Sequence, residues 1–201
     1  MTVRTAVLLA ALFFSPLLPT AHPLLAAEKT INIKEKMFAG QIDDIYLNSK
    51  EYEGKCVHLI CVLKGGVFFA CELAKRISVP VTIDFMSVSS YGDDTKSSGV
   101  VKIVKDLDQP LEGRDVLIVE DIIDSGRTLS YLIEILKKRN PASLKLCTLL
   151  DKPERRVRDV KVDYCCFNIP DEFVVGYGLD YAQKYRNLPF IGVVEPGAGE
   201  E

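Results

Sequence analysis

Short runs of apolar residues recur along the chain and alternate with segments whose apolar residues follow a helical spacing. Continuous apolar runs bounded by turn residues are typical of buried parallel strands, whereas apolar residues three or four positions apart indicate a helix. This pattern predicts strands at residues 57–62, 81–88, 100–104, 116–119, 144–150, 162–167 and 190–194. It predicts helices at residues 34–49, 67–77 and 127–139.

Strands that alternate with helices in this way indicate an α/β fold, built on a mostly parallel twisted sheet with helices on both faces. In such sheets, ligands bind at the carboxyl ends of the strands. Polar loops follow the strands that end at Val62, Val119 and Leu150. We therefore expect these three loops to meet at one edge of the sheet and to form a single site.

The first 27 residues depart from this pattern, because they have the layout of a secretory signal peptide. Arg4 precedes an apolar run at residues 6–18, and the small residues Ala26 and Ala27 follow. The run is short for a stable membrane span, and prolines interrupt it. Three interpretations stay open: a genuine export signal, an extension from a misplaced start codon, or an uncleaved and poorly ordered tail. We favour a cytoplasmic protein whose functional domain covers residues 28–196, with a frayed tail at residues 197–201.

The composition fits one ordinary globular domain, with 48% hydrophobic and 26% charged residues. A formal charge of −3 argues against a nucleic-acid-binding protein, which usually carries a basic patch. An even number of cysteines, six, could form disulfides, but most of them fall in predicted strands or in an apolar helix. With only two histidines and no Cys-x-x-Cys pair, a zinc site is not expected.

The stretch of residues 116–130 carries the strongest chemical signal of the chain. Four aliphatic residues are followed by Glu120 and Asp121, and then by Asp124 and a small polar loop that leads into a helix. Backbone N–H groups at a helix N-terminus bind phosphate, and the hydroxyls of Ser125 and Thr128 can join them. The acids suit a hydroxylated sugar or a hard divalent cation. A simple capped helix after a buried strand would leave the two adjacent acids unexplained.

Residues 116–130 resemble the phosphoribosyl diphosphate (PRPP) signature of the type I phosphoribosyltransferases, and their sequence is close to that of the hypoxanthine-guanine branch. Residues 63–66, Leu-Lys-Gly-Gly, resemble the diphosphate loop of that family, which carries a non-proline cis peptide at the leucine–lysine junction. Residues 169–181 are a second specific match, and the resemblance covers residues 31–194. It implies the type I fold, in which the terminal segments form a small hood beside the main sheet.

The resemblance also implies roles for residues that would bind PRPP and its metal. Glu120 and Asp121 would hold the ribose hydroxyls and a Mg²⁺ ion, and Asp180 would bind a second Mg²⁺. The 5′-phosphate would bind to Asp124, Ser125, Gly126, Arg127 and Thr128, although several relatives have lysine in place of Arg127. The diphosphate would contact Lys64, Gly65, Ser90, Tyr91 and Arg186, with Ser90 and Tyr91 on a flexible loop that closes over the reacting groups.

The base would be read by a second set of residues. Lys152 would donate to O6 of a 6-oxopurine, since an ammonium group has only donors and therefore favours a carbonyl over an amine. Phe173 would stack on the purine, and Val174 would offer its backbone to the pyrimidine edge. Asp124 would act at N7 as the general acid/base. A solvated Lys152 on a charged loop is the alternative for that residue.

The implied activity is purine salvage, in which hypoxanthine or guanine and PRPP give IMP or GMP and diphosphate, with Mg²⁺ as cofactor. Two alternatives stay open: a PRPP-sensing regulator that has lost catalysis, and a relative that prefers xanthine. The family forms dimers and tetramers, so we expect a homodimer or homotetramer. We expect neither a nucleic-acid partner nor a stable membrane span.

Overall fold

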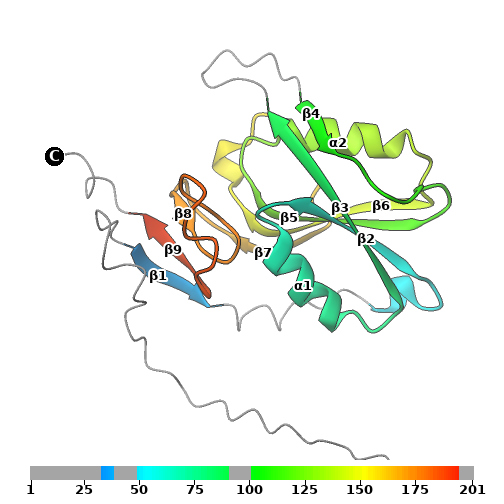
Figure 1. The fold of residues 1–201 in the computed structure, drawn as a ribbon, viewed down its shortest axis with the longest axis horizontal. Coiled ribbons are helices and arrows are strands. Elements are labelled where there is room, and N and C mark those ends of the chain that lie inside the picture. The colour runs from blue at the N-terminus through cyan, green and yellow to red at the C-terminus, as the bar shows by residue number, and fades with distance from the viewer. Residues whose placement is uncertain (1–32, 39–48, 91–100, 195–201) are drawn as a thin grey trace, which may run out of the picture.

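The computed structural model describes residues 33–38, 49–90 and 101–194, and its core is one six-stranded sheet (Figure 1). In spatial order the strands are β4 (Val101–Lys105), β3 (Val81–Ser90), β2 (Val57–Leu63), β5 (Asp115–Ile123), β6 (Ser143–Asp151) and β7 (Tyr164–Asn168). Strand β4 is antiparallel to β3, and every other neighbouring pair in this sheet is parallel. The predicted mostly parallel sheet is therefore confirmed.

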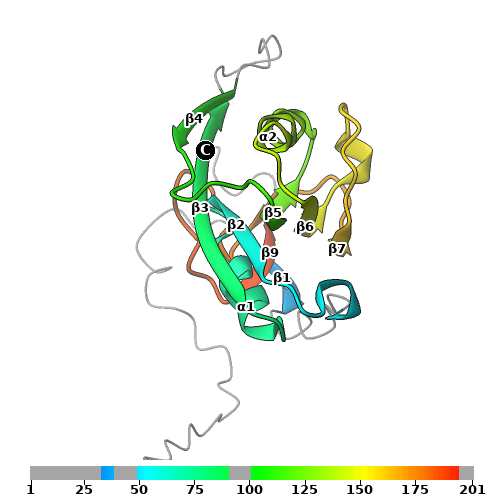
Figure 2. The same cartoon turned by 90° about the vertical axis from the view of Figure 1, so that its right-hand side faces the viewer.

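Helices α1 (Val67–Arg76) and α2 (Arg127–Lys137) cover opposite faces of the sheet (Figure 2). Side chains alternate between the two faces along a strand, so each strand contributes to two cores. In β2, Leu59 and Cys61 pack in the core under α1, whereas Ile60 and Val62 pack in the core under α2. This two-layer burial is what fixes the register of the central strands and, with it, the position of the loops that follow them.

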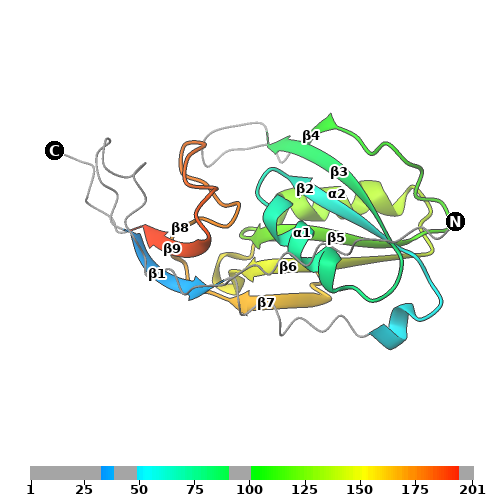
Figure 3. The same cartoon turned by 60° about the horizontal axis from the view of Figure 1, so that its bottom comes forward.

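A second sheet of three antiparallel strands forms the predicted hood. Its order is β1 (Ile33–Phe38), β9 (Phe190–Val194) and β8 (Val174–Val175). Figure 3 shows it beyond the edge of the main sheet at which β3, β5 and β7 end. Two short 3₁₀ turns, Ser49–Tyr52 and Pro153–Arg155, complete the described secondary structure. The hood therefore lies on the side where ligands bind in parallel sheets.

The predicted helix at residues 34–49 is wrong where the structure describes it, because residues 33–38 form strand β1. Its helical spacing was overridden by tertiary pairing with β9, in which Phe38 lies opposite Phe190. Strand β5 also continues past its predicted end at Val119 to Ile123, because β6 pairs with it as far as Asp151. Residues 1–27, Tyr91 and the predicted tail at 197–201 lie outside the described residues.

In the described ranges, no helix is both long and apolar enough to cross a membrane. All six cysteines are free thiols. Cys61 and Cys147 lie in the core under α1, where burial raises the pKa of the Cys61 thiol to about 12. These cysteines act as small apolar residues of the core.

Candidate active site

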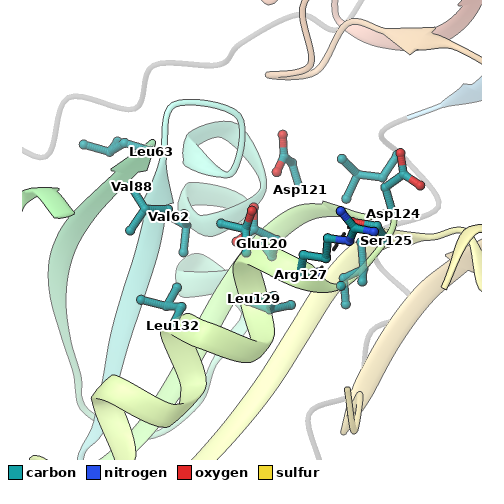
Figure 4. Close-up of a pocket in the computed structure, with 14 residues that line it drawn as sticks. Val62, Leu63, Val88, Glu120, Asp121, Asp124, Ser125, Arg127, Leu129 and Leu132 are labelled. Atoms are coloured by element: carbon teal, nitrogen blue, oxygen red, sulfur yellow. Dashed lines mark hydrogen bonds between the residues drawn. The ribbon is translucent and has the colours of Figure 1, made fainter. Parts of the chain in front are cut away.

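A pocket of about 270 Å³ opens where β5 ends and α2 begins. Its lining consists of residues 120–129 together with Val62, Leu63, Val88 and Leu132. Figure 4 shows Glu120, Asp121, Asp124, Ser125 and Arg127 gathered around this junction. The residues that the sequence singled out as an anion cradle thus form one concave surface.

The two adjacent acids continue the two apolar rows of β5. Glu120 lies in the α2-side pocket next to Leu129, while the carboxylate of Asp121 packs against the loop before α1. A Cβ on Gly65 would lie 1.6 Å from Oδ2 of Asp121, so the carboxylate fits only because residue 65 has no side chain. Burial first, and repulsion by Asp121 second, raises the pKa of Glu120 well above its usual value. Two carboxylates this close form a site that favours a cation.

The loop between β5 and α2 has a backbone that only glycine adopts easily. Gly126 has a φ of 75°, and a Cβ there would lie 2.9 Å from the carbonyl oxygen of Arg158. The carbonyl oxygen of Ser125 accepts hydrogen bonds from the amides of Val157 and Arg158, at 3.0 and 3.1 Å. The loop is therefore held in place, and α2 begins at the pocket with Arg127.

Asp124 and Lys152 are joined by a chain of charges that the sequence did not predict. Arg155 Nε donates to Asp124 Oδ1 at 3.1 Å, and Arg155 Nη1 lies 3.5 Å from Asp171 Oδ2. Asp171 Oδ1 lies in turn 3.8 Å from Lys152 Nζ. The side chains predicted to act on N7 and on O6 of a purine are thus connected through two further residues.

Lys152 is not the solvated lysine of the alternative interpretation, because only 7% of it is exposed. Its backbone amide donates to the carbonyl oxygen of Ile123 at 2.9 Å, which fixes it beside the end of β5. It does not line the pocket of residues 120–129. The loops after Val119 and Leu150 therefore meet at one edge, as expected, but Lys152 lies at the margin of the pocket.

The predicted diphosphate loop touches the loop of residues 176–189, which joins β8 to β9. The Leu63–Lys64 peptide bond is cis, as the resemblance implies. A Cβ on Gly178 would lie 2.0 Å from the carbonyl oxygen of Gly65, so the two loops meet backbone to backbone. Arg186 Nη1 donates to the carbonyl oxygen of Gly178 at 2.7 Å, and its Nη2 lies 2.6 Å from Asp180 Oδ1. Lys64, Gly65, Asp180 and Arg186 are thus assembled at one place.

Phe173 and Val174 lie where β8 begins. The Phe173 ring is 52% exposed and meets the edge of Tyr181, with ring centres 5.7 Å apart. Val174 is buried and pairs with Val193 of β9. An exposed aromatic ring held by a neighbouring ring is available to stack on a planar ligand.

Some predicted positions are not brought into this arrangement. Ser90 ends strand β3, and only its backbone is described, whereas Tyr91 lies outside the described residues. Three residues that the sequence did not single out, Arg155, Asp171 and Gln183, have side chains that contact predicted site residues. Asp171 and Arg155 each lie within three residues of Phe173 or Lys152, which was the available signal. In the part of the chain that the structure describes, no group of three or more His, Cys, Asp or Glu residues could hold a metal.

Comparison with known proteins matches residues 30–182 to the phosphoribosyl transferase domain. The chain belongs to the phosphoribosyltransferase family. A hypoxanthine-guanine phosphoribosyltransferase of Bacillus subtilis is 51% identical over 177 residues, which cover 88% of this chain and 95% of that protein. One of Streptococcus thermophilus is 51% identical over 172 residues, covering 86% of this chain and 92% of the relative.

Solved structures agree with these relatives. A crystal structure of a hypoxanthine phosphoribosyltransferase from Staphylococcus aureus has a TM-score of 0.79 and 44% identity, covering 84% of this chain and 94% of that one. A hypoxanthine-guanine phosphoribosyltransferase from Bacillus anthracis has a TM-score of 0.77 and 47% identity, covering 82% and 100% of the two chains. The predicted family, fold and purine-salvage activity of the enzyme are therefore confirmed.

Proposed function

We propose that this enzyme transfers the phosphoribosyl group of PRPP to hypoxanthine or guanine at the pocket where β5 ends. The observation that carries the proposal is the acid-lined pocket of residues 120–129, with the chain of charges from Asp124 to Lys152 beside it. The pocket would bind the phosphate and the sugar of PRPP, and Lys152 at its margin would bind the purine base. Together they supply both reactants with partners at one edge of the sheet.

The PRPP half of the site would use the junction of β5 and α2. The 5′-phosphate would bind to the backbone amides and hydroxyls of residues 124–128, at the positive end of the helix. Glu120 and Asp121 would hold the ribose hydroxyls. Lys64 and Arg186, which lie on touching loops, would bind the diphosphate, with the Gly65 backbone beside it. Ser90 and Tyr91 would cover the reacting groups and limit access of water.

Mg²⁺ fits the donors that the chain provides. Magnesium in nucleotide-handling enzymes usually takes one or two carboxylates and completes its shell with substrate oxygens and waters. Glu120 and Asp121 supply such a pair, and burial and the charge of Asp121 raise the pKa of Glu120. The ion would neutralise and orient the diphosphate as it leaves. Asp180 would contribute to a second ion, although here it is engaged by Arg186.

The purine half of the site would lie between Lys152 and the hood. The ammonium group of Lys152 would donate to O6, and Phe173 would stack on the ring, with the Val174 backbone at the pyrimidine edge. Asp124 would receive or return the proton at N7 as the base attacks C1 of PRPP and diphosphate departs. The remaining acceleration would come from positioning and from charge stabilisation.

The rest of the chain allows a few coarser proposals. Residues 28–196 form the catalytic domain, and the enzyme acts in the cytoplasm as a homodimer or homotetramer on small molecules, without nucleic acid. Light scattering coupled to size-exclusion chromatography would give the oligomeric state. Mass spectrometry of the purified protein would show whether residues 1–27 are present. A mature start near Glu28 in an exported fraction would contradict the cytoplasmic location.

A spectrophotometric assay with PRPP, Mg²⁺ and a panel of bases tests the function. We expect turnover of hypoxanthine and guanine, little of adenine, and loss of activity on chelation of the metal. Tight PRPP binding without turnover of any base would indicate a regulator instead. A clear preference for xanthine would indicate a xanthine phosphoribosyltransferase instead.

A further inference from the structure

One side chain that the proposed mechanism does not use, Gln183, lies between the two cations assigned to diphosphate. Its amide oxygen, Oε1, accepts a hydrogen bond from Lys64 Nζ at 3.1 Å and a longer one from Arg186 Nη2 at 3.4 Å. Lys64 and Arg186 come from loops far apart in the sequence. Lys64 of the diphosphate loop and Arg186 of the loop of residues 176–189 therefore share one acceptor, the Gln183 amide oxygen.

The backbone around Gln183 is shaped to present this side chain. Gln183 has a φ of 67°, and its neighbours Ala182 and Tyr185 have φ values of 49° and 71°, a region that L residues seldom adopt. The turn is closed by paired backbone bonds between Tyr181 and Lys184, at 2.9 and 3.1 Å. The amide of Gln183 also donates to Asp180 Oδ2 at 2.8 Å. An unusual backbone fixed by three hydrogen bonds indicates that the direction of the side chain matters.

The neutral amide oxygen of Gln183 is a weaker acceptor than the diphosphate oxygen that Lys64 and Arg186 would bind. It has two lone pairs and a partial negative charge, so it can accept from both donors at once, as a diphosphate oxygen would with full charge. It also keeps two like charges apart and oriented while no anion is present. A carboxylate at this place would bind both cations far more strongly. A side chain without an acceptor would remove this partner from Lys64 and leave Arg186 with its contacts to Asp180 and Gly178.

We propose that Gln183 is a placeholder for diphosphate. Its amide oxygen occupies the position between Lys64 and Arg186 that a diphosphate oxygen takes when PRPP binds, and it returns there when diphosphate leaves. Gln183 is thus a positioning residue that sets how tightly the enzyme holds PRPP and its product. The inference rests on the proposed role of Lys64 and Arg186 as the diphosphate-binding cations.

The test compares Gln183→Met, which keeps the length of the side chain but removes the acceptor, with Gln183→Glu, which adds a charge. Because a placeholder competes with the substrate, Gln183→Met lowers the KM for PRPP and the inhibition constant of Mg²⁺-diphosphate by about two- to fivefold, the range of exposed polar contacts. Gln183→Glu raises both constants by about the same factor or more. If Gln183 served only to support the loop, both substitutions would weaken binding.

The same two substitutions at Gln109, an exposed residue of the β4–β5 connection away from the pocket, are the matched control and should leave both constants unchanged. Lys64→Met separates this inference from the proposed function. Weaker diphosphate binding in Lys64→Met, with changes of opposite sign in the two Gln183 variants, supports both. Weaker binding in Lys64→Met with changes of the same sign, or none, at Gln183 overturns the placeholder alone. Normal binding in Lys64→Met overturns both.

Discussion

Acidic side chains in the amino half of β3 and at the carboxyl end of β5 lie in different surroundings. In the amino half of β3, the Asp84 side chain is 1% exposed and accepts hydrogen bonds from the amides of Phe85, Asp108 and Gln109, at 2.7, 2.9 and 3.1 Å. At the carboxyl end, Glu120 and Asp121 lie side by side, and the pKa of Glu120 is raised by burial and by its neighbour.

The difference separates a structural charge from a functional one. A buried carboxylate with three backbone donors is satisfied within the protein, so it ties the β4–β5 connection to β3. In the partly exposed pair of Glu120 and Asp121, the neighbouring charge opposes ionisation of Glu120, so a bound cation would stabilise the pair. Asp84 therefore stabilises the fold, whereas we expect Glu120 and Asp121 to serve a ligand.

The largest effect is expected for Asp124→Ala at the carboxyl end. Loss of general acid/base catalysis lowers kcat by about 10²- to 10³-fold, while the dissociation constant of PRPP, measured by calorimetry, changes much less. Asp159→Ala, in an exposed acid outside the pocket, is the control and should behave as the wild type. Equal losses in kcat and in PRPP affinity would remove Asp124 from proton transfer.

Asp84→Ala tests the buried carboxylate in the amino half of β3. Three backbone amides lose their acceptor, which lowers the free energy of unfolding by about 2–4 kcal/mol in urea denaturation. The folded enzyme keeps its KM values, because Asp84 takes no part in the site. Asp108→Ala, which breaks only an exposed pair with Lys105, should cost far less. A stable Asp84→Ala enzyme with altered kinetics would contradict the structural role of Asp84.

Lys152→Ala should change the choice of base. Without the donor to O6, the preference for hypoxanthine and guanine over adenine falls by about tenfold, as kcat/KM ratios would show, while PRPP binding is spared. Lys161→Ala is a suitable control, since its side chain is 85% exposed and pairs with Asp163. An unchanged ranking of the bases would exclude Lys152 from the purine site.

The smallest effect concerns His58, whose Nδ1 lies 2.7 Å from Thr82 Oγ1. Burial first, and the positive charge of Arg114 second, lowers the pKa of His58 below its usual 6.5. The unfolded chain therefore takes up a proton before the folded chain does. This part of the stability is complete above pH 6.5 and is lost as the pH falls toward the folded pKa. The stability of His58→Gln should decline less than that of the wild type as the medium is acidified, in denaturant titrations at several pH values.

Local pattern predicted most of the fold, because buried parallel strands are continuous apolar runs that periodicity detects. It failed where pairing between distant segments decides the structure. The sequence around strand β1 has a helical spacing of apolar residues, and only the pairing with β9 makes it a strand. Likewise, nothing local shows that β5 continues through its acids to Ile123, since β6 determines this.

The candidate site divides in the same way. Glu120, Asp121 and Asp124 could be found because they interrupt a regular apolar pattern. Gln183 could not, because its importance lies in its contact with Lys64, which depends on how the loops fold back, and Arg155 had only its nearness to Lys152 as a signal. Asp84 had a visible signal, a lone acid inside an apolar strand, but only the structure shows the amides that satisfy it.

The pairing of β1 with β9 has a consequence for how the molecule is made. Strand β1 leaves the ribosome early, but its partner β9 is the last of the described strands to be synthesised. The six-stranded sheet can therefore assemble while β1 still has an open edge, and contacts between such distant segments form slowly. The hood closes only after β9 has been synthesised, so a nascent chain that has folded its main sheet still lacks the hood beside its candidate site.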